Sequence, residues 1–392
     1  MPDYDVIVAG GSISGLLAAR EIAAGDLSVA VLEEDSEIGT PEHCGGVVSM
    51  SGIHNLGIVP DIKTIENSSI THAKIFSHSS CFEISAAKQK VIVLDRRAFD
   101  KQIAYQAQNK GAEIRVKCSM RSFGKQDDEY LVKTSEGDLS CEYFVDARGV
   151  GSLISRNREG VLQSAQYEIY ASWIEPDTIE VAFDSQLYPG FFAWIIPTGR
   201  ARGKVGVAGR GINAASALQY YLDSKGKHSV MRKIYAPIWI NGPLKSFVTD
   251  RTIIVGDAAG QSKPTTAGGI YSCGMAGVLA GRALVNSAEQ SNSDRKEKQL
   301  LLLKYYESKW LSMFKAEFDK MLLVRRLFER MDNRAIDDLI NAIPPEVIQE
   351  ASSDGDFDFH SSAVARILGA KRAARMAKTL FGNEIRRLLP ES

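Results

Sequence analysis

The first 33 residues carry the apolar pattern of a strand, a tight turn, a helix and a second strand. Residues 5–9 are a β-branched apolar run of strand length, and residues 16–24 are rich in alanine, as is common in helices. Residues 28–33 are again apolar and end in an acid. This order predicts a β–α–β unit at the start of the chain.

The turn between the first strand and the helix is rich in glycine. Gly10 and Gly15 fit the outer positions of a G-x-G-x-x-G pattern, whereas Ser12 replaces its middle glycine. Backbone N–H groups at a helix N-terminus hold a pyrophosphate if no side chain blocks its approach, and an acid about twenty residues further on, here Glu33, binds a ribose hydroxyl. We therefore expect a dinucleotide site. A plain β–α–β packing unit is the alternative.

The later pattern predicts that this layer continues and is interrupted by an antiparallel sheet. The expected elements are short strands over 70–93, a helix over 95–111, a strand over 113–118, a hairpin at 136–137, a buried strand over 143–147, antiparallel strands over 166–208, a strand and glycine turn over 251–260, and a helix over 270–285. Beyond residue 287 the pattern is helical and charged, with a loop expected over 290–298. The antiparallel sheet indicates a substrate-handling domain.

Composition and charge exclude several classes of function. The chain of 392 residues has a formal net charge of -1, so its overall charge does not indicate nucleic-acid binding. Its five cysteines include no C-x-x-C pair and its six histidines show no H-E-x-x-H spacing, so we expect neither a disulfide framework nor a metal site. Because the sequence shows no run of eighteen apolar residues and no leader before the first strand, we expect a cytoplasmic protein.

Three blocks of sequence resemble those of the archaeal geranylgeranyl reductase (digeranylgeranylglycerophospholipid reductase) family, whose flavin enzymes saturate isoprenoid chains and share the fold of aromatic hydroxylases. They are the N-terminal glycine turn with Glu33, the D-R-R-A-F-D stretch at 95–100, and Gly256-Asp257 with the segment 264–270. The resemblance covers most of the chain up to about residue 285. It implies that one extended FAD contacts all three blocks.

The resemblance also implies which residues hold the FAD. Arg96 contacts its pyrophosphate or ribityl region, Asp257 bonds a ribityl hydroxyl, and the backbone N–H groups that follow stabilise negative charge on the reduced ring. The full set of expected cofactor contacts is Gly10, Ser12, Ser14, Gly15, Glu33, Cys44, Gly45, Val47, Arg96, Met120, Asp257, Gly268, Gly269 and Ile270. Considered alone, Asp257 also suits the N-cap of a helix.

Two further motifs separate this family from the hydroxylases. The first is P-E-H-C-G at 41–45, which matches the family's P-x-x-C-G loop beside the flavin. The resemblance implies that Cys44 or a nearby water supplies a proton to the substrate and that His43 relays it. A packing role for Cys44 and a structural role for His43 are the alternatives.

The second motif is P-G-F-F-A-W-I-I-P at 189–197, which is similar to the family's Y-x-W-x-F-P substrate channel. Trp194 and Pro197 are retained, whereas Phe192 replaces tyrosine and Ile196 replaces phenylalanine. We expect substrate contacts at Phe192, Trp194 and Pro197. An ordinary aromatic core strand is the alternative.

These resemblances imply an FAD-dependent reductase that saturates C=C bonds of geranylgeranyl chains in archaeal membrane lipid precursors by hydride transfer. The implied partners are an isoprenoid lipid and an electron donor, either ferredoxin or NAD(P)H. Arg148 stands where many hydroxylases have an aspartate linked to nicotinamide binding, which weakens the case for a nicotinamide donor. A flavin monooxygenase of the same fold and a flavin electron carrier are the alternatives, but the motifs at Cys44 and Trp194 favour the reductase.

Residues 361–392 have the pattern of a basic amphipathic helix, with apolar residues at spacings of three and four. Such a helix can lie on an anionic bilayer and give peripheral membrane contact. Docking on its own catalytic domain is favoured, because Gly369 and Gly382 weaken an isolated helix.

The whole pattern predicts an α/β (α+β) fold in three parts. An FAD-binding Rossmann-type three-layer domain is expected over 1–65, 95–160 and 246–288. An interleaved antiparallel β-sheet substrate domain is expected over 66–94 and 161–245, and a helical C-terminal region over 289–392.

Overall fold

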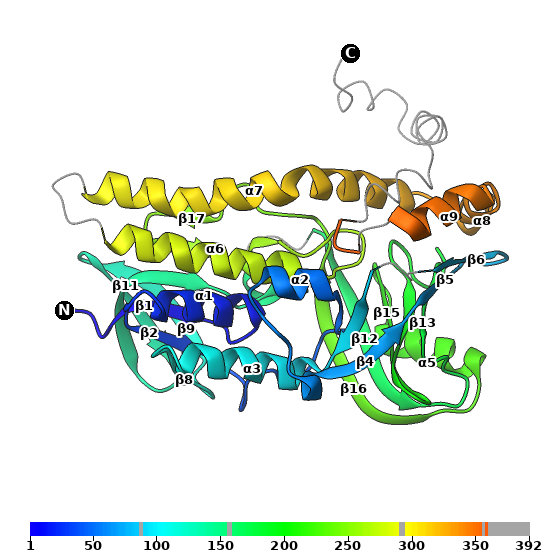
Figure 1. The fold of residues 1–392 in the computed structure, drawn as a ribbon, viewed down its shortest axis with the longest axis horizontal. Coiled ribbons are helices and arrows are strands. Elements are labelled where there is room, and N and C mark those ends of the chain that lie inside the picture. The colour runs from blue at the N-terminus through cyan, green and yellow to red at the C-terminus, as the bar shows by residue number, and fades with distance from the viewer. Residues whose placement is uncertain (86–88, 155–158, 290–294, 355–356, 360–392) are drawn as a thin grey trace, which may run out of the picture.

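The computed structural model describes residues 1–85, 89–154, 159–289, 295–354 and 357–359. In this part of the chain the strands form an eight-stranded, a seven-stranded and a three-stranded sheet, and helices cover the two larger ones (Figure 1). This mixed arrangement of sheets and helices confirms the predicted α/β fold.

The eight-stranded sheet contains the predicted β–α–β unit. Its strands are β1 (Tyr4–Ala9), β2 (Val29–Leu32), β8 (Glu113–Arg115), β9 (Met120–Gln126), β10 (Glu129–Thr134), β11 (Asp138–Asp146), β17 (Val248–Thr249) and β18 (Thr252–Ile254). β18, β11, β1, β2 and β8 lie in that order and run parallel, so the strand expected near 113–118 lies beside β2. β9 and β10 form an antiparallel ribbon that joins β11 at the expected hairpin.

Three helices pack on one face of this sheet: α1 (Ile13–Ala23), α3 (Arg96–Gln108) and α6 (Ile270–Ala288). Two glycines let α6 approach α1 closely. A Cβ atom at Gly277 would lie 2.1 Å from the carbonyl oxygen of Ser14, and one at Gly281 would lie 2.6 Å from that of Ala18. The contact between the two helices is therefore made backbone against backbone.

The seven-stranded sheet lies at the other end of the molecule (Figure 1). In sheet order its strands are β16 (Ser229–Trp239), β12 (Val161–Tyr170), β15 (Arg202–Gly209), β14 (Ala193–Gly199), β13 (Thr178–Ala182), β5 (His72–Phe76) and β6 (Cys81–Ser85). Neighbouring strands are antiparallel except for β13 and β5. Helix α5 (Ala214–Lys225) packs with Ala193 and Ile195, so Trp194 and Ile196 face the opposite side of the sheet.

A three-stranded sheet, made of β3 (Val47–Ser49), β4 (Ile65–Ile70) and β7 (Val91–Leu94), joins the two larger ones. Val48 and Leu94 are buried in the core beneath α1, whereas Val93 packs against Ile196 of the seven-stranded sheet. The shorter helices are α2 (Met50–Asn55), α4 (Val150–Ile154), η1 (Ile62–Thr64) and η2 (Gly256–Ala259).

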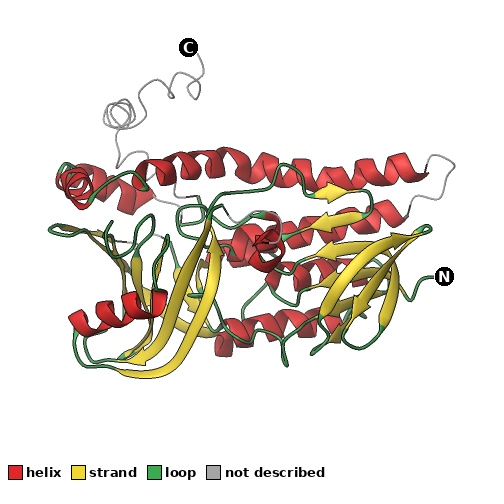
Figure 2. Cartoon of the chain, turned by 180° about the vertical axis from the view of Figure 1, so that it is seen from behind, coloured by secondary structure: helices red, strands yellow, loops and turns green. Residues whose placement is uncertain are grey.

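The helical region that follows consists of α7 (Arg295–Phe328), α8 (Asn333–Asn341) and α9 (Pro345–Asp354). Figure 2 shows the two larger sheets at opposite ends of the molecule, with the long α7 running above both. The loop expected over 290–298 is wrong for 295–298, because arginine, lysine and glutamate favour helix and these residues form the first turn of α7. The helix expected over 361–392 lies outside the described residues. Among the described helices, none has an apolar stretch long enough to cross a membrane.

Candidate functional site

The glycine turn after β1 has the geometry of an anion-binding turn. Gly10 has φ +111°, and a Cβ atom there would lie 2.3 Å from the carbonyl oxygen of Ala147. A Cβ atom at Gly15 would lie 2.0 Å from the Gly10 carbonyl oxygen. Ser12 is the N-cap of α1, and within the described residues its side chain makes no capping hydrogen bond. The N-terminus of α1 therefore presents backbone N–H groups without a side-chain cap.

Glu33 lies beside this turn, at the end of β2. Its carboxylate accepts hydrogen bonds from the backbone N–H groups of Gly11 at 2.7 Å and Asp35 at 2.9 Å. Desolvation by burial raises the pKa of Glu33 above its ordinary value. The structure thus places this predicted ribose-binding acid against the predicted pyrophosphate turn.

Arg96 lies close to the same turn. It is the first residue of α3, whose N-terminus is capped by the Asp95 side chain. Asp100 accepts two hydrogen bonds from Arg96 Nη2, at 2.8 and 2.9 Å, and Ser12 Oγ lies 3.4 Å from the same nitrogen. Burial disfavours the charge on Arg96, but Asp100 and Cys44 nearby keep its pKa above its ordinary value. The fold therefore brings Arg96 together with Ser12 and Cys44, from two other predicted parts of the site.

A second helix N-terminus lies at α6, which begins after the glycine pair 268–269. Gly269 is its N-cap, and in the described part of the chain it has no side-chain cap.

Asp257 lies in η2 and caps neither helix, so the N-cap alternative for this residue is wrong. The Cys273 thiol lies 3.4 Å from Asp257 Oδ1, and desolvation raises the pKa of Asp257. A Cβ atom at Gly256 would lie 2.4 Å from Ser14 Oγ, which places η2 against the first turn of α1.

The loop 41–45 lies between the two larger sheets and carries Cys44. The thiol is half-buried and accepts a hydrogen bond from the Gly46 N–H at 3.3 Å. A Cβ atom at Gly45 would lie 2.5 Å from Cδ1 of Ile196, so the loop packs directly on β14. The neighbouring His43 side chain is exposed, and partial desolvation lowers its pKa.

Glu42 anchors this loop by a buried ion cluster. Its side chain is fully buried, with Lys204 Nζ 2.6 Å from Oε1 and Arg232 Nη2 2.7 Å from Oε2. Oε1 also accepts the backbone N–H of Arg96 at 3.1 Å. Lys204 is itself fully buried and lies 2.8 Å from Glu66. Four segments of the chain, from α3, β4, β15 and β16, therefore converge on the loop that carries Cys44.

The aromatic motif forms a wall next to this loop. The rings of Phe191 and Phe192 are stacked with centroids 4.1 Å apart, and Trp194 meets both edge-on. The Trp194 indole packs directly on Gly206, because a Cβ atom on that glycine would lie only 2.2 Å from Cζ2 of the ring. Trp194 Nε1 donates to Oε1 of Gln166 at 3.1 Å, and Gln166 Nε2 donates to the Cys44 carbonyl at 3.4 Å.

Of the other predicted residues, Val47 and Pro197 lie near the wall, whereas Met120 does not. Val47 packs with Trp194 and Ile196. The Pro197 carbonyl accepts the Asn67 amide at 2.9 Å. Met120 begins β9 and packs under the opposite face of the eight-stranded sheet, in the cluster that contains Ala9 and Leu32.

Several residues of this region were missed by the sequence analysis, above all Gln166, Lys204, Arg232 and Arg325. A signal existed for Lys204, because a lysine inside the otherwise apolar run 203–208 is unusual for a buried strand. The segment 357–359 was also missed. Lys263 Nζ donates to the Phe357 carbonyl at 3.1 Å, and Phe357 packs in the cluster that contains Trp194.

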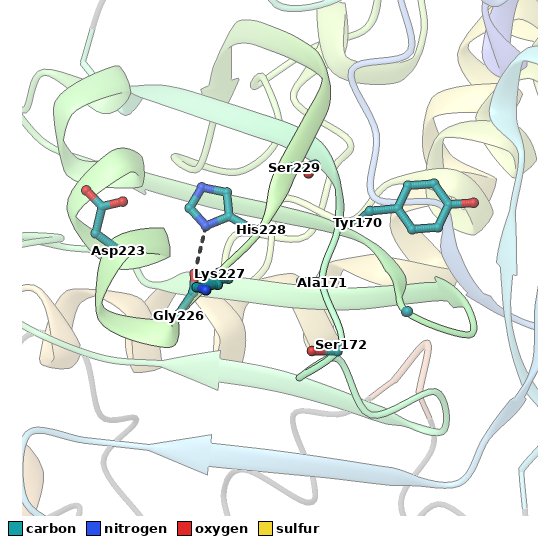
Figure 3. A pocket seen from close by; sticks show the side chains of 9 residues that line it. Tyr170, Ala171, Ser172, Asp223, Gly226, Lys227, His228 and Ser229 are labelled. Carbon is teal, nitrogen blue, oxygen red and sulfur yellow. Dashed lines mark hydrogen bonds between the residues drawn. The ribbon is translucent and has the colours of Figure 1, made fainter.

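A surface cavity of about 800 Å³ lies elsewhere, at the far ends of β12 and β16 (Figure 3). Its lining includes Tyr170, Asp223 and His228, and His228 Nδ1 lies 2.9 Å from the Gly226 carbonyl. The lining contains none of the predicted site residues.

The chain is similar over most of its length to proteins of methanogenic archaea, although no protein-family model matches it. It is 28% identical over 373 residues to digeranylgeranylglycerophospholipid reductase 2 of Methanopyrus kandleri, a span covering 88% of this chain and 92% of that protein. An uncharacterized protein of Methanocaldococcus jannaschii is 28% identical over 387 residues, covering 93% of this chain and 95% of that protein.

Solved structures share the fold. A geranylgeranyl bacteriochlorophyll reductase-like protein of Thermoplasma acidophilum superposes with a TM-score of 0.79 at 20% identity, covering 98% of each chain. A flavin-dependent brominase superposes with a TM-score of 0.66 at 18% identity, covering 98% of this chain and all of the other. The resemblance predicted from the motifs is confirmed: over most of its length the chain is a homologue of archaeal proteins named digeranylgeranylglycerophospholipid reductase.

Proposed function

We propose that this protein is an FAD-dependent reductase that saturates C=C bonds of geranylgeranyl chains in archaeal membrane lipid precursors. The observation that carries the proposal is that a single side chain, Gln166, links the Cys44 loop to Trp194 of the aromatic wall, in a molecule with two helix N-termini that suit a dinucleotide. The substrate class follows from the names of the relatives, which refer to a geranylgeranylated glycerophospholipid.

The residues at the two helix N-termini fit an FAD. In the described chain neither α1 nor α6 has a side-chain cap, and the glycines at 10 and 15 leave no side chain over the first of them. We assign the turn 10–15 and Glu33 to the ADP half, Arg96 to the pyrophosphate, and Asp257 with 268–270 to the ribityl chain and ring. When bound and reduced, FAD would supply a hydride to one alkene carbon.

The chain's own residues would hold the prenyl group, exclude water and supply the proton. The partly exposed Trp194, backed by the buried Phe192, would offer an apolar surface to the substrate. Cys44 Sγ would carry the proton for the second alkene carbon, so that hydride and proton together convert C=C into CH–CH. His43, exposed on the same loop, would return a proton to Cys44 from solvent.

We infer that electrons reach the flavin from ferredoxin or NAD(P)H and that the lipid is taken from the cytoplasmic membrane face. Arg148, which stands at the position linked to nicotinamide binding, is folded back on its own strand. Its Nε and Nη2 donate to Asp146 at 3.0 and 2.9 Å. This pairing favours ferredoxin, because the guanidinium is already bound to a buried carboxylate.

Single-turnover kinetics test the proposal. Reduced holoenzyme is mixed with a digeranylgeranyl phospholipid, flavin reoxidation is followed by absorbance, and saturated products are measured by mass spectrometry. Cys44→Ser is expected to slow reoxidation about 100-fold without loss of flavin, because general acid catalysis contributes about that factor. Cys81→Ser, an exposed cysteine on β6, is the matched control.

Two outcomes would contradict the proposal. Reoxidation of the Cys44→Ser variant at the wild-type rate would remove the donor role. A wild-type enzyme that leaves the lipid unchanged, and instead forms a flavin hydroperoxide with O2 and a hydroxylated product, would be the monooxygenase.

A further inference from the structure

We propose that Gln166 is a positioning residue that couples the Trp194 indole to the loop carrying Cys44. The inference rests on the proposed function, because it concerns the spacing between the substrate wall and the proton donor. It assigns a role to a side chain that matches none of the sequence motifs. The inference is supported by the side-chain amide of Gln166, which forms hydrogen bonds with both Trp194 and the Cys44 carbonyl.

Gln166 lies on β12, between two hydrogen-bonded neighbouring strands of the seven-stranded sheet. It is buried on β12, and its backbone pairs with Gly206 of β15 on one side and Ile234 of β16 on the other. Because both neighbouring strands fix its Cα, its side chain reaches the loop from a defined point. The amide is therefore a fixed spacer between two parts of the site.

Only an amide satisfies both partners at this position. Oε1 accepts the Trp194 Nε1–H at 3.1 Å, while Nε2 donates to the Cys44 carbonyl at 3.4 Å. Glutamate keeps the acceptor but loses the donor, and leucine has neither. Since Gln166 is buried, water cannot readily replace either partner.

Both groups that Gln166 bonds, the Trp194 indole and the Cys44 loop, are also packed closely against the seven-stranded sheet. The indole lies against Gly206 with no space for a Cβ atom there, and Gly45 lies against Ile196 in the same way. The ring therefore packs directly on β15 and the loop directly on β14. The Gln166 amide bridges the ring and the loop, so its two hydrogen bonds help to set their relative position.

Thiol reactivity measures the coupling without substrate. In a Cys81→Ser background, which removes the exposed cysteine, iodoacetamide alkylation of Cys44 is followed by mass spectrometry, with Cys44→Ser as the blank. Gln166→Leu is expected to change the alkylation rate at least threefold and to shift the tryptophan emission maximum. Gln163→Leu, an exposed glutamine on the same strand, is the matched control and should change neither.

A double-mutant cycle separates coupling from a general loss of structure. Trp194→Phe keeps a ring but removes the N–H donor, so it should alter Cys44 alkylation in the wild-type background and have no further effect beside Gln166→Leu. If the two substitutions act additively, or if Gln166→Leu leaves alkylation and emission unchanged, the proposal is overturned.

Gln166→Glu is the second variant if the leucine variant does not fold, and it should retain the wild-type emission while altering alkylation.

Turnover then distinguishes this inference from the proposed function. If the lipid is reduced, Gln166→Leu should lower kcat more than it raises KM, because it misplaces the donor relative to the wall. If no lipid is reduced by the wild type, the proposed function fails, while the alkylation cycle still decides whether Gln166 couples the two parts.

Discussion

At the scale of single residues, Glu42 anchors the loop that carries Cys44. Burial alone would raise the pKa of Glu42, but Lys204 and Arg232 lower it below the ordinary value of 4.5. The carboxylate is therefore ionised in the folded protein at neutral pH. Removing its charge would leave Lys204 with Glu66 alone, in a part of the protein that excludes water.

We predict that Glu42→Gln lowers the free energy of unfolding by about 3 kcal/mol at pH 7, because the buried Lys204 and its neighbour Arg232 each lose one of their two carboxylate partners. Urea denaturation followed by circular dichroism measures the change. Glu37→Gln, which breaks an exposed pair with Lys101 at 2.8 Å just before the same loop, is the control and should change the midpoint little. Equal effects of the two variants would show that the buried cluster does not hold the loop.

The same cluster gives a pH dependence with a definite sign. Because the pKa of Glu42 is lower in the folded than in the unfolded chain, its contribution is complete above about pH 4.5 and is lost as the pH falls through the folded value. The difference in stability between wild type and Glu42→Gln should therefore be constant near neutrality and shrink below that pH. Denaturation midpoints measured between pH 7 and pH 3 test this, and a difference that grows on acidification would contradict it.

At the scale of elements, the contact of α1 with α6 determines whether the two helix N-termini can serve one ligand. A Cβ atom at Gly277 would lie 2.1 Å from the backbone of Ser14, and the Gly256 turn touches the Ser14 side chain. Any side chain at Gly277 would push α6 away from α1. The distance between the two N-termini would then change.

Gly277→Ala should destabilise the protein by roughly 2 kcal/mol through overpacking and should release FAD, measured as free flavin after gel filtration. Gly151→Ala is the control, because it is also a helical glycine but its Cβ atom would meet no atom of the described residues within 4 Å. Since alanine favours helix over glycine, this control should be neutral or slightly stabilising. Retention of flavin and stability by Gly277→Ala would show that the two helices can separate without cost to the site.

Local patterns predicted the elements well and the long-range contacts of the site poorly. The spacing of apolar residues is a property of neighbouring positions, so it correctly placed the strand, glycine turn and helix around Gly10. Resemblance added Cys44, Arg96 and Trp194, and the structure brings these three motifs together. Gln166 was missed because its role depends on which segments β12 brings together, and the lysine in the apolar run at 204 did not reveal its partners Glu42 and Glu66, which are distant in sequence.

At the scale of the whole molecule, α7 contacts two segments of the site that are far apart in sequence, near Gly190 and Pro264. Arg325 is buried and donates to the Pro264 carbonyl at 3.2 Å and to the Gly190 carbonyl, while its guanidinium lies 5.0 Å from the centre of the Phe191 ring. Pro264 opens the segment assigned to the flavin, and Gly190 opens the aromatic motif. One side chain therefore contacts both the segment that we propose holds the flavin and the motif that we propose lines the substrate channel.

Arg325→Met is expected to destabilise the protein by about 2 kcal/mol, because the buried Pro264 carbonyl and the partly buried Gly190 carbonyl lose a charged donor. Hydrogen exchange should accelerate in both 264–269 and 189–194, even though these segments are far apart in sequence. Arg326→Met, exposed on the same helix, is the matched control. Faster exchange in only one of the two segments would show that Arg325 serves that segment alone.

The buried cluster at Glu42 also has a consequence for the order in which the protein folds. Its partners Lys204 and Arg232 lie 162 and 190 residues further along the chain. Closing such distant contacts is slow, and it requires that β15 and β16 are already paired with β12. We therefore expect the Cys44 loop to become protected from proteolysis only after the seven-stranded sheet has formed, so that a refolding chain completes its dinucleotide turn first and its thiol loop last.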